Sequence, residues 1–282
     1  MKIVVTGVNG QLGYDVLKEL DQRSYNNVIG IDINDLDITD ANAVSVFMDQ
    51  HKPNVIIHCA AYTAVDKAED NHDLCMNVNV NGTKHLVDKA KELNAKFIYI
   101  STDYVFNGEK DTQYETSDQP NPNSVYGKSK YLGELETMKH EKHFIVRISW
   151  VFGKNGFNFV KTMLRLGKER EFISVVSDQI GSPTYTFDLS RLLVDMIETD
   201  KYGIYHATNE HHCSWYEFTK EIMKNSKLDT KIIPINSNDY PTKAKRPTNS
   251  LMSKNSLDLN GFKRLPTWED ALKRYLKEIG VL

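Results

Sequence analysis

The chain has 282 residues, of which 40% are hydrophobic and 26% are charged, as is usual for a globular protein with a large core. Its formal net charge of −3 argues against a broad basic surface that would bind nucleic acid. No stretch is long and apolar enough to cross a bilayer, and the apolar run at the N-terminus is too short for a signal peptide.

Short apolar runs alternate with amphipathic stretches over the first 150 residues. The runs are rich in Val and Ile and mostly continuous, which is typical of strands covered on both faces of a parallel sheet. We expect these strands over residues 3–6, 28–32, 55–61, 97–102 and 144–150. Between them we expect helices over residues 12–21, 41–51, 78–93 and 126–140, the second capped by Asp40. This alternation predicts an α/β fold with a Rossmann-type, doubly wound parallel sheet.

The pattern changes after residue 152. Helices are expected over residues 157–169, 187–199, 215–224 and 268–277, strands over 173–176 and 204–208, and a polar loop over 236–247. No linker and no repeat separates the two halves. We therefore expect residues 1–152 to form the dinucleotide-binding core. Residues 153–282 would mainly form a smaller substrate-binding lobe, with some segments returning to the core and a cleft between the two.

The cysteines and histidines predict neither disulfides nor a metal centre. Cys59, Cys75 and Cys213 are odd in number and form no C-x-x-C pair, which favours reduced thiols in the cytoplasm. The histidines also lack the spacing of metal ligands, and the adjacent pair His211 and His212 is expected to be solvated.

A glycine-rich turn follows the first expected strand and opens the first expected helix. Gly7 would make the tight turn, Gly10 would let backbone amides approach a pyrophosphate, and Gly13 would let the helix lie close to the sheet. The helix N-terminus adds free N–H groups and a partial positive charge. Asp32 ends the second strand, where an acid can bind the adenosine ribose. Structural glycines and a surface acid are the alternative, and the choice between NADPH and NADH stays open because no Arg follows Asp32 closely.

Tyr126 and Lys130 have the Y-x-x-x-K spacing at the start of an expected helix, so both side chains lie on one face. The lysine is expected to lower the pKa of the tyrosine, which could then give a proton to a developing alkoxide. Thr102 ends a strand at the sheet edge where ligands bind, and its hydroxyl could orient a substrate oxygen. An exposed helical pair is the alternative interpretation of the tyrosine and the lysine.

The chain closely resembles the dTDP-4-dehydrorhamnose reductase family of the extended short-chain dehydrogenase/reductases, nearly from end to end. Two blocks point specifically to this family: Ser-Thr-Asp-Tyr-Val-Phe at 101–106 and Asp-Gln-Ile-Gly-Ser-Pro-Thr at 178–184. Further blocks lie at residues 7–13, 59–69, 126–130, 147–152, 158–163 and 246–250.

The resemblance implies reduction of the C4 keto group of dTDP-4-dehydro-L-rhamnose by NADPH or NADH, a step in making surface polysaccharide. Tyr126 would then be the proton donor, Lys130 would hold the ribose, Thr102 and Asp103 would contact the sugar, and Trp150 would pack on its ring. The resemblance also implies cofactor contacts at Gly7, Gly10, Gln11, Leu12, Gly13, Asp32, Asp37, Ile38, Ala60, Ala61 and Thr63, besides Tyr126 and Lys130.

Some residues distinguish this chain from relatives of the family. Tyr104 stands where related dehydratases carry a Glu, which favours simple reduction. Asp15 stands where some members have a Glu that joins a Mg²⁺ site at a dimer contact, so we expect no metal and a solvated Asp15, and a homodimer stays open. Arg246 is our candidate for a contact with the substrate phosphates.

Two other functions are compatible with the same motifs. One is a catalytically idle nucleotide-binding subunit like the regulatory partner of methionine adenosyltransferase, although the joint presence of Thr102, Tyr126 and Lys130 argues against it. The other is a nucleotide-sugar epimerase that keeps its NAD bound and shows no net redox change.

Overall fold

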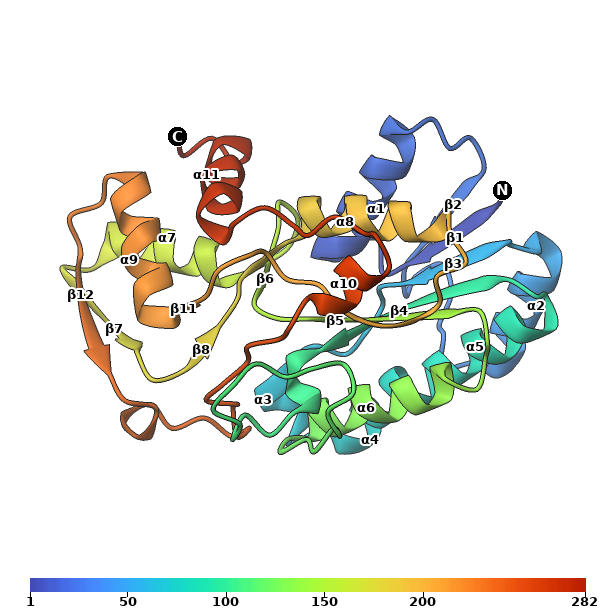
Figure 1. Ribbon diagram of the computed structural model, residues 1–282, viewed down its shortest axis with the longest axis horizontal. Coiled ribbons are helices and arrows are strands. Elements are labelled where there is room, and N and C mark those ends of the chain that lie inside the picture. The colour runs from blue at the N-terminus through green and yellow to red at the C-terminus, as the bar shows by residue number, and fades with distance from the viewer.

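The computed structural model describes residues 1–282, and its centre is a sheet of six parallel strands. The spatial order is β10-β5-β4-β3-β1-β2, with all neighbours parallel. This is the doubly wound order 2-1-3-4-5 extended by one strand, and the chain changes its winding direction between β1 and β3. The predicted fold class is confirmed (Figure 1). The strands are β1 (Ile3–Thr6), β2 (Val28–Ile31), β3 (Val55–His58), β4 (Lys96–Thr102), β5 (His143–Ile148) and β10 (Gly203–His206).

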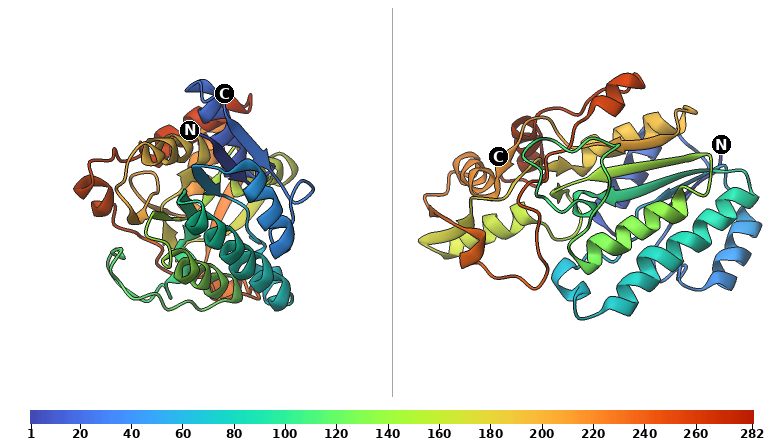
Figure 2. Two further views of the ribbon diagram at one scale, coloured as in Figure 1. Left: turned by 90° about the vertical axis from the view of Figure 1, so that its right-hand side faces the viewer. Right: turned by 60° about the horizontal axis from the view of Figure 1, so that its bottom comes forward.

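Helices cover both faces of this sheet, as Figures 1 and 2 show. On one face lie α1 (Gln11–Gln22) and α8 (Thr186–Ile197), and on the other lie α2 (Ala41–His51), α5 (Thr83–Glu92) and α6 (Val125–Thr137). The strands bury apolar side chains on both faces in two separate clusters, which explains their continuous apolar sequence. Asp40 caps α2 by accepting the N–H groups of Asn42 and Ala43, as predicted.

The helix predicted over residues 78–93 begins as a turn of π-helix. After α3 (Val65–Ala68), the chain runs through α4 (His72–Met76) and the π-helical residues Asn77–Gly82 into α5. The extra residue in such a turn changes the direction of side chains, and such turns are frequent at functional sites.

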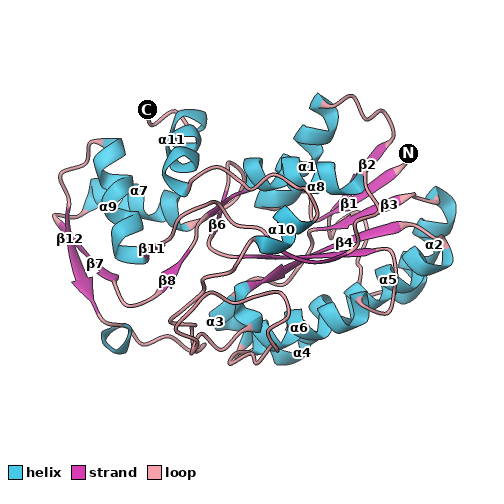
Figure 3. Cartoon of the chain, viewed as in Figure 1, coloured by secondary structure: helices cyan, strands magenta, loops and turns pink.

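The second lobe lies beyond one end of the sheet, as Figure 3 shows. It has its own apolar core. Its helices are α7 (Phe159–Glu169), α9 (Trp215–Ser226) and α11 (Trp268–Glu278), and α10 (Asn255–Leu259) lies closer to the sheet. Three two-stranded pairs complete it: β6 (Val151–Phe152) with β9 (Thr184–Tyr185), β7 (Phe172–Val176) with β12 (Lys231–Ile235), and β8 (Ile180–Gly181) with β11 (Cys213–Ser214).

Two segments of the second half return to the first. Helix α8 packs against α1, and β10 pairs with β5 at the sheet edge.

No helix combines the length and the apolar character needed to cross a lipid bilayer. The three cysteines form no disulfide.

Candidate active site

A cleft of about 670 Å³ opens at the carboxyl ends of the central strands, beside the second lobe. It brings together every residue predicted for the site except Arg246. The predicted residues on its walls are Gly7, Gly10, Gln11, Leu12, Gly13, Asp32, Asp37, Ile38, Ala60, Ala61, Thr63, Thr102, Asp103, Tyr126, Lys130 and Trp150. Ligands of open α/β sheets bind at this edge, next to the point where the winding direction changes.

The glycine turn has the shape that a pyrophosphate requires. Gly7 has a φ of +71°, and a methyl group there would lie 2.6 Å from the amide nitrogen of Ala60. At Gly13 a methyl group would overlap the carbonyl oxygen of Gly7, so only glycine lets α1 approach the turn this closely. Gly10 is the N-cap of α1 and has no capping side chain, which leaves the first N–H groups of the helix facing the cleft. These residues fit a dinucleotide.

Replacing Gly13 with alanine is expected to weaken cofactor binding at least about tenfold, because a methyl group in backbone contact shifts α1 away from the turn. Fluorescence titration with reduced cofactor measures this effect. Gln22→Ala, at the exposed last turn of the same helix, should bind as tightly as the parent chain. Equal affinity of all three proteins would show that the turn does not hold the cofactor.

Thr102 and Asp103 form a buried polar pair at the end of β4. The hydroxyl of Thr102 donates to Asp103 Oδ1 at 2.9 Å and accepts the Tyr104 N–H at 3.2 Å. Asp103 Oδ2 accepts the hydroxyl of Ser250 at 2.5 Å. Burial raises the pKa of Asp103 to about 6, although both hydroxyls favour its charged form.

Tyr126 lies half-buried in the first turn of α6, with its ring edge-to-face against Tyr104 at 5.6 Å. Burial raises the pKa of its phenol, and the nearby hydroxyl of Thr102 only partly offsets this. The expected lowering of the Tyr126 pKa is therefore wrong, because desolvation dominates. The phenol stays protonated at neutral pH, as a proton donor must be.

Lys130 is buried one helical turn further along α6. Its Nζ lies 4.0 Å from the centre of the Tyr99 ring, and the Tyr99 hydroxyl donates to the Lys130 carbonyl at 3.1 Å. Burial lowers the pKa of Lys130 to about 7, while the negative charge of Glu134 acts in the opposite direction. Keeping the charged ammonium group in this site, away from water, therefore lowers the stability of the fold.

This cost predicts how stability depends on pH. Above pH 7 the folded chain loses the Lys130 proton, whereas the unfolded chain keeps it up to about pH 10. The unfolded state then binds more protons, so the free energy of unfolding should rise with pH between about 7 and 10. In Lys130→Met this contribution should vanish, which denaturant unfolding of both proteins at several pH values will measure. Parallel pH profiles of the two proteins would contradict the assignment.

Trp150 lies on the cleft wall in a conformation that non-glycine residues rarely adopt, with a φ of +51°. Its ring stacks on Trp215, which begins α9, with centroids 3.6 Å apart. A methyl group at Gly181 would come within 2.5 Å of the same ring. Because protein covers so much of the indole, Trp150 has less free surface for a sugar than the sequence suggested.

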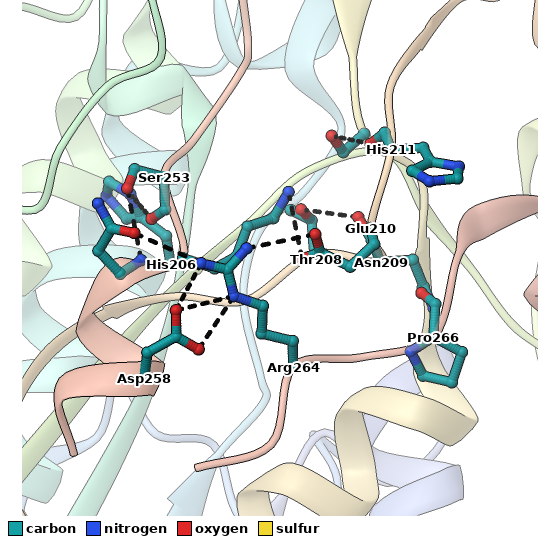
Figure 4. A network of polar contacts seen from close by, with 12 residues as sticks. His206, Thr208, Asn209, Glu210, His211, Ser253, Asp258, Arg264 and Pro266 are labelled. Atoms are coloured by element: carbon teal, nitrogen blue, oxygen red, sulfur yellow. Dashed lines mark hydrogen bonds and ion pairs between the residues drawn. The ribbon is translucent and has the colours of Figure 1, made fainter. Parts of the chain in front are cut away.

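The C-terminal segment that carries Ser250 is fixed by a polar network, drawn in Figure 4. Nε of Arg264 donates to both carboxylate oxygens of Asp258 at 3.0 Å, and its Nη1 lies 3.4 Å from Glu210. His206, at the end of β10, bonds the carbonyl of Ser253 at 3.1 Å. These contacts anchor the segment to the sheet three residues from Ser250.

Asn79 is a site-supporting residue that sequence reasoning missed. It lies in the π-helical turn, where its Oδ1 accepts the N–H of Tyr62 at 2.8 Å and its Nδ2 donates to the Tyr62 carbonyl at 3.1 Å. Its Nδ2 also bonds Ser129, between Tyr126 and Lys130 on α6, at 2.9 Å. Asn79 thus joins two walls of the cleft, and no local pattern signalled this.

Arg246, the one predicted site residue outside the cleft, and Asp15, which was expected to be solvated, lie elsewhere. Arg246 lines a separate cavity of about 370 Å³, where its Nη2 donates to Asp66 at 3.0 Å and its Nε is buried without a partner. Asp15 is buried and accepts the hydroxyl of Thr186, so its expected solvated position is wrong. No group of three or more His, Cys, Asp or Glu side chains has an arrangement that could hold a metal ion.

The fold and the cleft together define a nicotinamide-dependent reductase of the short-chain dehydrogenase type. The model of the RmlD substrate binding domain family matches residues 1–281, and the chain belongs to this family. The predicted family and the predicted class of enzyme, an NAD(P)H-dependent oxidoreductase, are confirmed.

Relatives and solved structures agree with this assignment. A dTDP-4-dehydrorhamnose reductase of Aggregatibacter actinomycetemcomitans is 42% identical, covering 96% of this chain and 97% of the relative. The Escherichia coli enzyme of the same name is 32% identical over 99% and 98% of the two chains. The crystal structure of the Bacillus anthracis reductase in complex with NADP matches with a TM-score of 0.96 and 44% identity, covering 99% of this chain and 100% of that one. A Thermus thermophilus UDP-glucose 4-epimerase, 17% identical, shares only the fold.

Proposed function

We propose that this chain reduces the 4-keto group of dTDP-4-dehydro-L-rhamnose with NADPH or NADH, giving dTDP-L-rhamnose for surface polysaccharide. The observation that carries the proposal is the meeting of Thr102, Tyr126 and Lys130 in one cleft with the glycine turn. When bound, a reduced nicotinamide supplies the hydride for the carbonyl carbon.

The residues of the chain supply the proton and hold the charge. Thr102 and Tyr126 would hydrogen-bond the carbonyl oxygen, where negative charge develops during the reaction. Tyr126, kept protonated by burial, then gives its phenolic proton to that oxygen, so that the ketone becomes a hydroxyl. Lys130 would donate to the ribose hydroxyls beside the reacting centre, and Asp103 would accept a sugar hydroxyl next to Thr102.

A spectrophotometric assay tests the reaction. Addition of dTDP-4-dehydrorhamnose to the chain with excess reduced cofactor should cause continuing loss of the reduced-nicotinamide absorbance. No loss would favour a binding subunit, and no loss together with an isomerised sugar would favour an epimerase. The complete proton-donating set favours a reductase over an idle binding subunit, and Tyr104, in place of the dehydratase Glu, favours simple reduction over dehydration. Relatives named as reductases at 32–42% identity favour a reductase over an epimerase.

Arg246 would bind the substrate diphosphate by exchanging its bond to Asp66 for the phosphate oxygens. Arg246→Ala is expected to raise KM for the nucleotide sugar about tenfold or more, because a charge-assisted hydrogen bond is lost, with little change in cofactor affinity. The matched control is Lys245→Ala, which removes an exposed cation paired with Glu109. Initial rates at varied sugar concentration measure the effect, and an unchanged KM in Arg246→Ala would contradict the role.

We also propose a domain arrangement, a cellular location and an oligomeric state for this enzyme. Residues 153–282 would mainly form the substrate-binding lobe, apart from α8 and β10, which return to the core. Free cysteines support a cytoplasmic location, and the negative net charge supports a small-molecule substrate rather than nucleic acid. The resemblance supports a homodimer, which light scattering of the purified chain would test.

A further inference from the structure

The cleft rim after β2 is acidic and has no basic counterpart. Asp32, Asp35 and Asp37 follow the strand within six residues, and the side chains of Ile33 and Asn34 between them are exposed. Asp32 and Asp37 line the cleft, and Asp35 lies beside it, bonded to the N–H of Asp32. Among the 32 residues that line the cleft, the only Lys or Arg is Lys130, which lies on α6 beside Tyr126. The part of the cleft at the end of β2 therefore has carboxylates and no cation.

Three backbone donors at this rim are also occupied by carboxylates. Asp32 Oδ2 accepts the N–H of Asn9 from the glycine turn at 2.9 Å, and its Oδ1 accepts the N–H of Ile33 at 2.8 Å. The N–H of Asp32 itself donates to Asp35 Oδ2 at 2.8 Å. These amides would otherwise be free to bind an anion, and each now has a carboxylate acceptor from the chain.

The carboxylate of Asp37, further along the rim, also accepts bonds from donors of the chain. Asp37 Oδ1 accepts both the N–H and the hydroxyl of Thr39, at 2.9 and 2.7 Å. These two bonds lower the pKa of Asp37 and keep its negative charge at the cleft wall. A ligand at this place therefore meets the negative carboxylates of Asp32 and Asp37.

NADH and NADPH differ at the group that this rim would meet. An acid at the end of the second strand bonds the 2′-hydroxyl of the adenosine ribose, whereas a 2′-phosphate needs a cation nearby. A hydroxyl can donate to a carboxylate, but a phosphate monoester carries about −1.5 to −2 charges and only accepts. Placed here, the phosphate would face the carboxylate of Asp32, with Asp35 beside it, and no Lys or Arg among the residues that line this part of the cleft.

We propose that this chain prefers NADH to NADPH, and that Asp32 and Asp35 are the residues that set the preference. The inference rests on the proposed function, because it takes the cleft to be the cofactor site. The related reductase of Bacillus anthracis was crystallised with NADP, so the fold itself admits the phosphorylated cofactor. The preference is thus a property of the residues after β2 and not of the family fold.

Direct binding of the two cofactors tests the inference without the sugar. Calorimetric titration of the intact chain with NADH and with NADPH, at low salt, should give a Kd for NADH at least about tenfold lower, because carboxylates repel the phosphate. The ratio of the two Kd values should shrink as salt is added. Equal affinities, or tighter binding of NADPH, would overturn the inference.

A designed variant tests the residues themselves. Ile33→Arg combined with Asp35→Asn adds a cation at an exposed position and removes one charge, while the oxygen of the new side-chain amide can still accept the Asp32 N–H. The preference for NADH should fall at least about tenfold in this variant. The control is Leu259→Arg, which adds an exposed cation in α10, away from the cleft residues, and should leave the ratio unchanged. A ratio unchanged in both variants would refute the assignment to these residues.

The experiments distinguish a failure of the proposed cofactor preference from a failure of the proposed reaction. Tight NADPH binding with intact sugar reduction would refute the preference alone. Selective NADH binding without any sugar reduction would refute the proposed reaction but support the preference. Binding of neither cofactor would refute both.

Discussion

Replacing Tyr126 with phenylalanine is expected to lower kcat at least about a hundredfold, because a positioned general acid contributes about 10² to 10⁴ in rate. Only the phenolic oxygen is removed, so the edge-to-face contact with Tyr104 and the start of α6 should remain. Cofactor affinity should therefore stay close to that of the parent chain. Steady-state rates with saturating sugar and cofactor, together with a cofactor titration, measure both quantities.

The matched control for this variant is Tyr131→Phe on the same helix. The Tyr131 hydroxyl accepts a bond from Gln119 at 3.2 Å and does not line the cleft. Its removal should change kcat less than about twofold, as expected for a surface group that does not contact the reacting atoms. If Tyr126→Phe also kept near-normal kcat, another group would deliver the proton.

Replacing Glu134 with alanine is expected to destabilise the fold by about 3–5 kcal/mol, the usual effect of removing one partner of a buried ion pair. Glu134 lies on α6, two turns after Tyr126, and is fully buried. It accepts two bonds from Arg147, at 2.8 and 2.7 Å, and one from Ser101 at 2.5 Å. Without it, Arg147 would keep a buried charge with no acid to balance it.

Chemical denaturation of Glu134→Ala and of a control measures this loss. Glu136→Ala removes a carboxylate from the same helix whose partner, Lys139, is mostly exposed, and should cost less than about 1 kcal/mol. Glu134→Met combined with Arg147→Met should recover part of the loss, because a buried pair can be replaced by apolar groups. A similar small loss for Glu134→Ala and Glu136→Ala would show that the buried pair is not important for stability.

Much of the core could be predicted from local sequence patterns. The continuous apolar runs gave the five strands β1 to β5 to within a few residues, since a strand buried on both faces must be apolar throughout. The helix α2 was predicted with its cap, because Asp40 acts within its own turn. Cleft residues in the turn after β1, at the end of β4 and on α6 could be predicted because strand ends and i, i+4 spacing fix their place.

Features that depend on distant partners could not be predicted. The bond between Arg246 and Asp66 joins residues 180 apart in sequence, and the stacking of Trp150 on Trp215 joins the two lobes. Strand β12 contains Pro234 and pairs only with β7, so its pattern was weak. The π-helical turn at Asn79 changes side-chain directions without changing the apolar period that we used.

The two errors about charged groups have one cause, which is burial. Sequence spacing placed Lys130 near Tyr126 but gave no measure of desolvation, which dominates the pKa of both groups. Asp15 was expected on a solvated helix face, but α8 returns to cover α1 and buries it against Thr186. Local patterns show which residues share a face of a helix or strand. Only the packing of distant elements shows how far that face is shielded from water.

The most direct test of the central claim is isotope transfer from a cofactor deuterated at the reactive position of the nicotinamide. We expect the chain, given this cofactor and dTDP-4-dehydrorhamnose, to form dTDP-L-rhamnose with one deuterium at C4 of the sugar for each cofactor oxidised, as mass spectrometry and NMR would show. Sugar product without deuterium, or cofactor bound without any reduction of the ketone, would contradict the account.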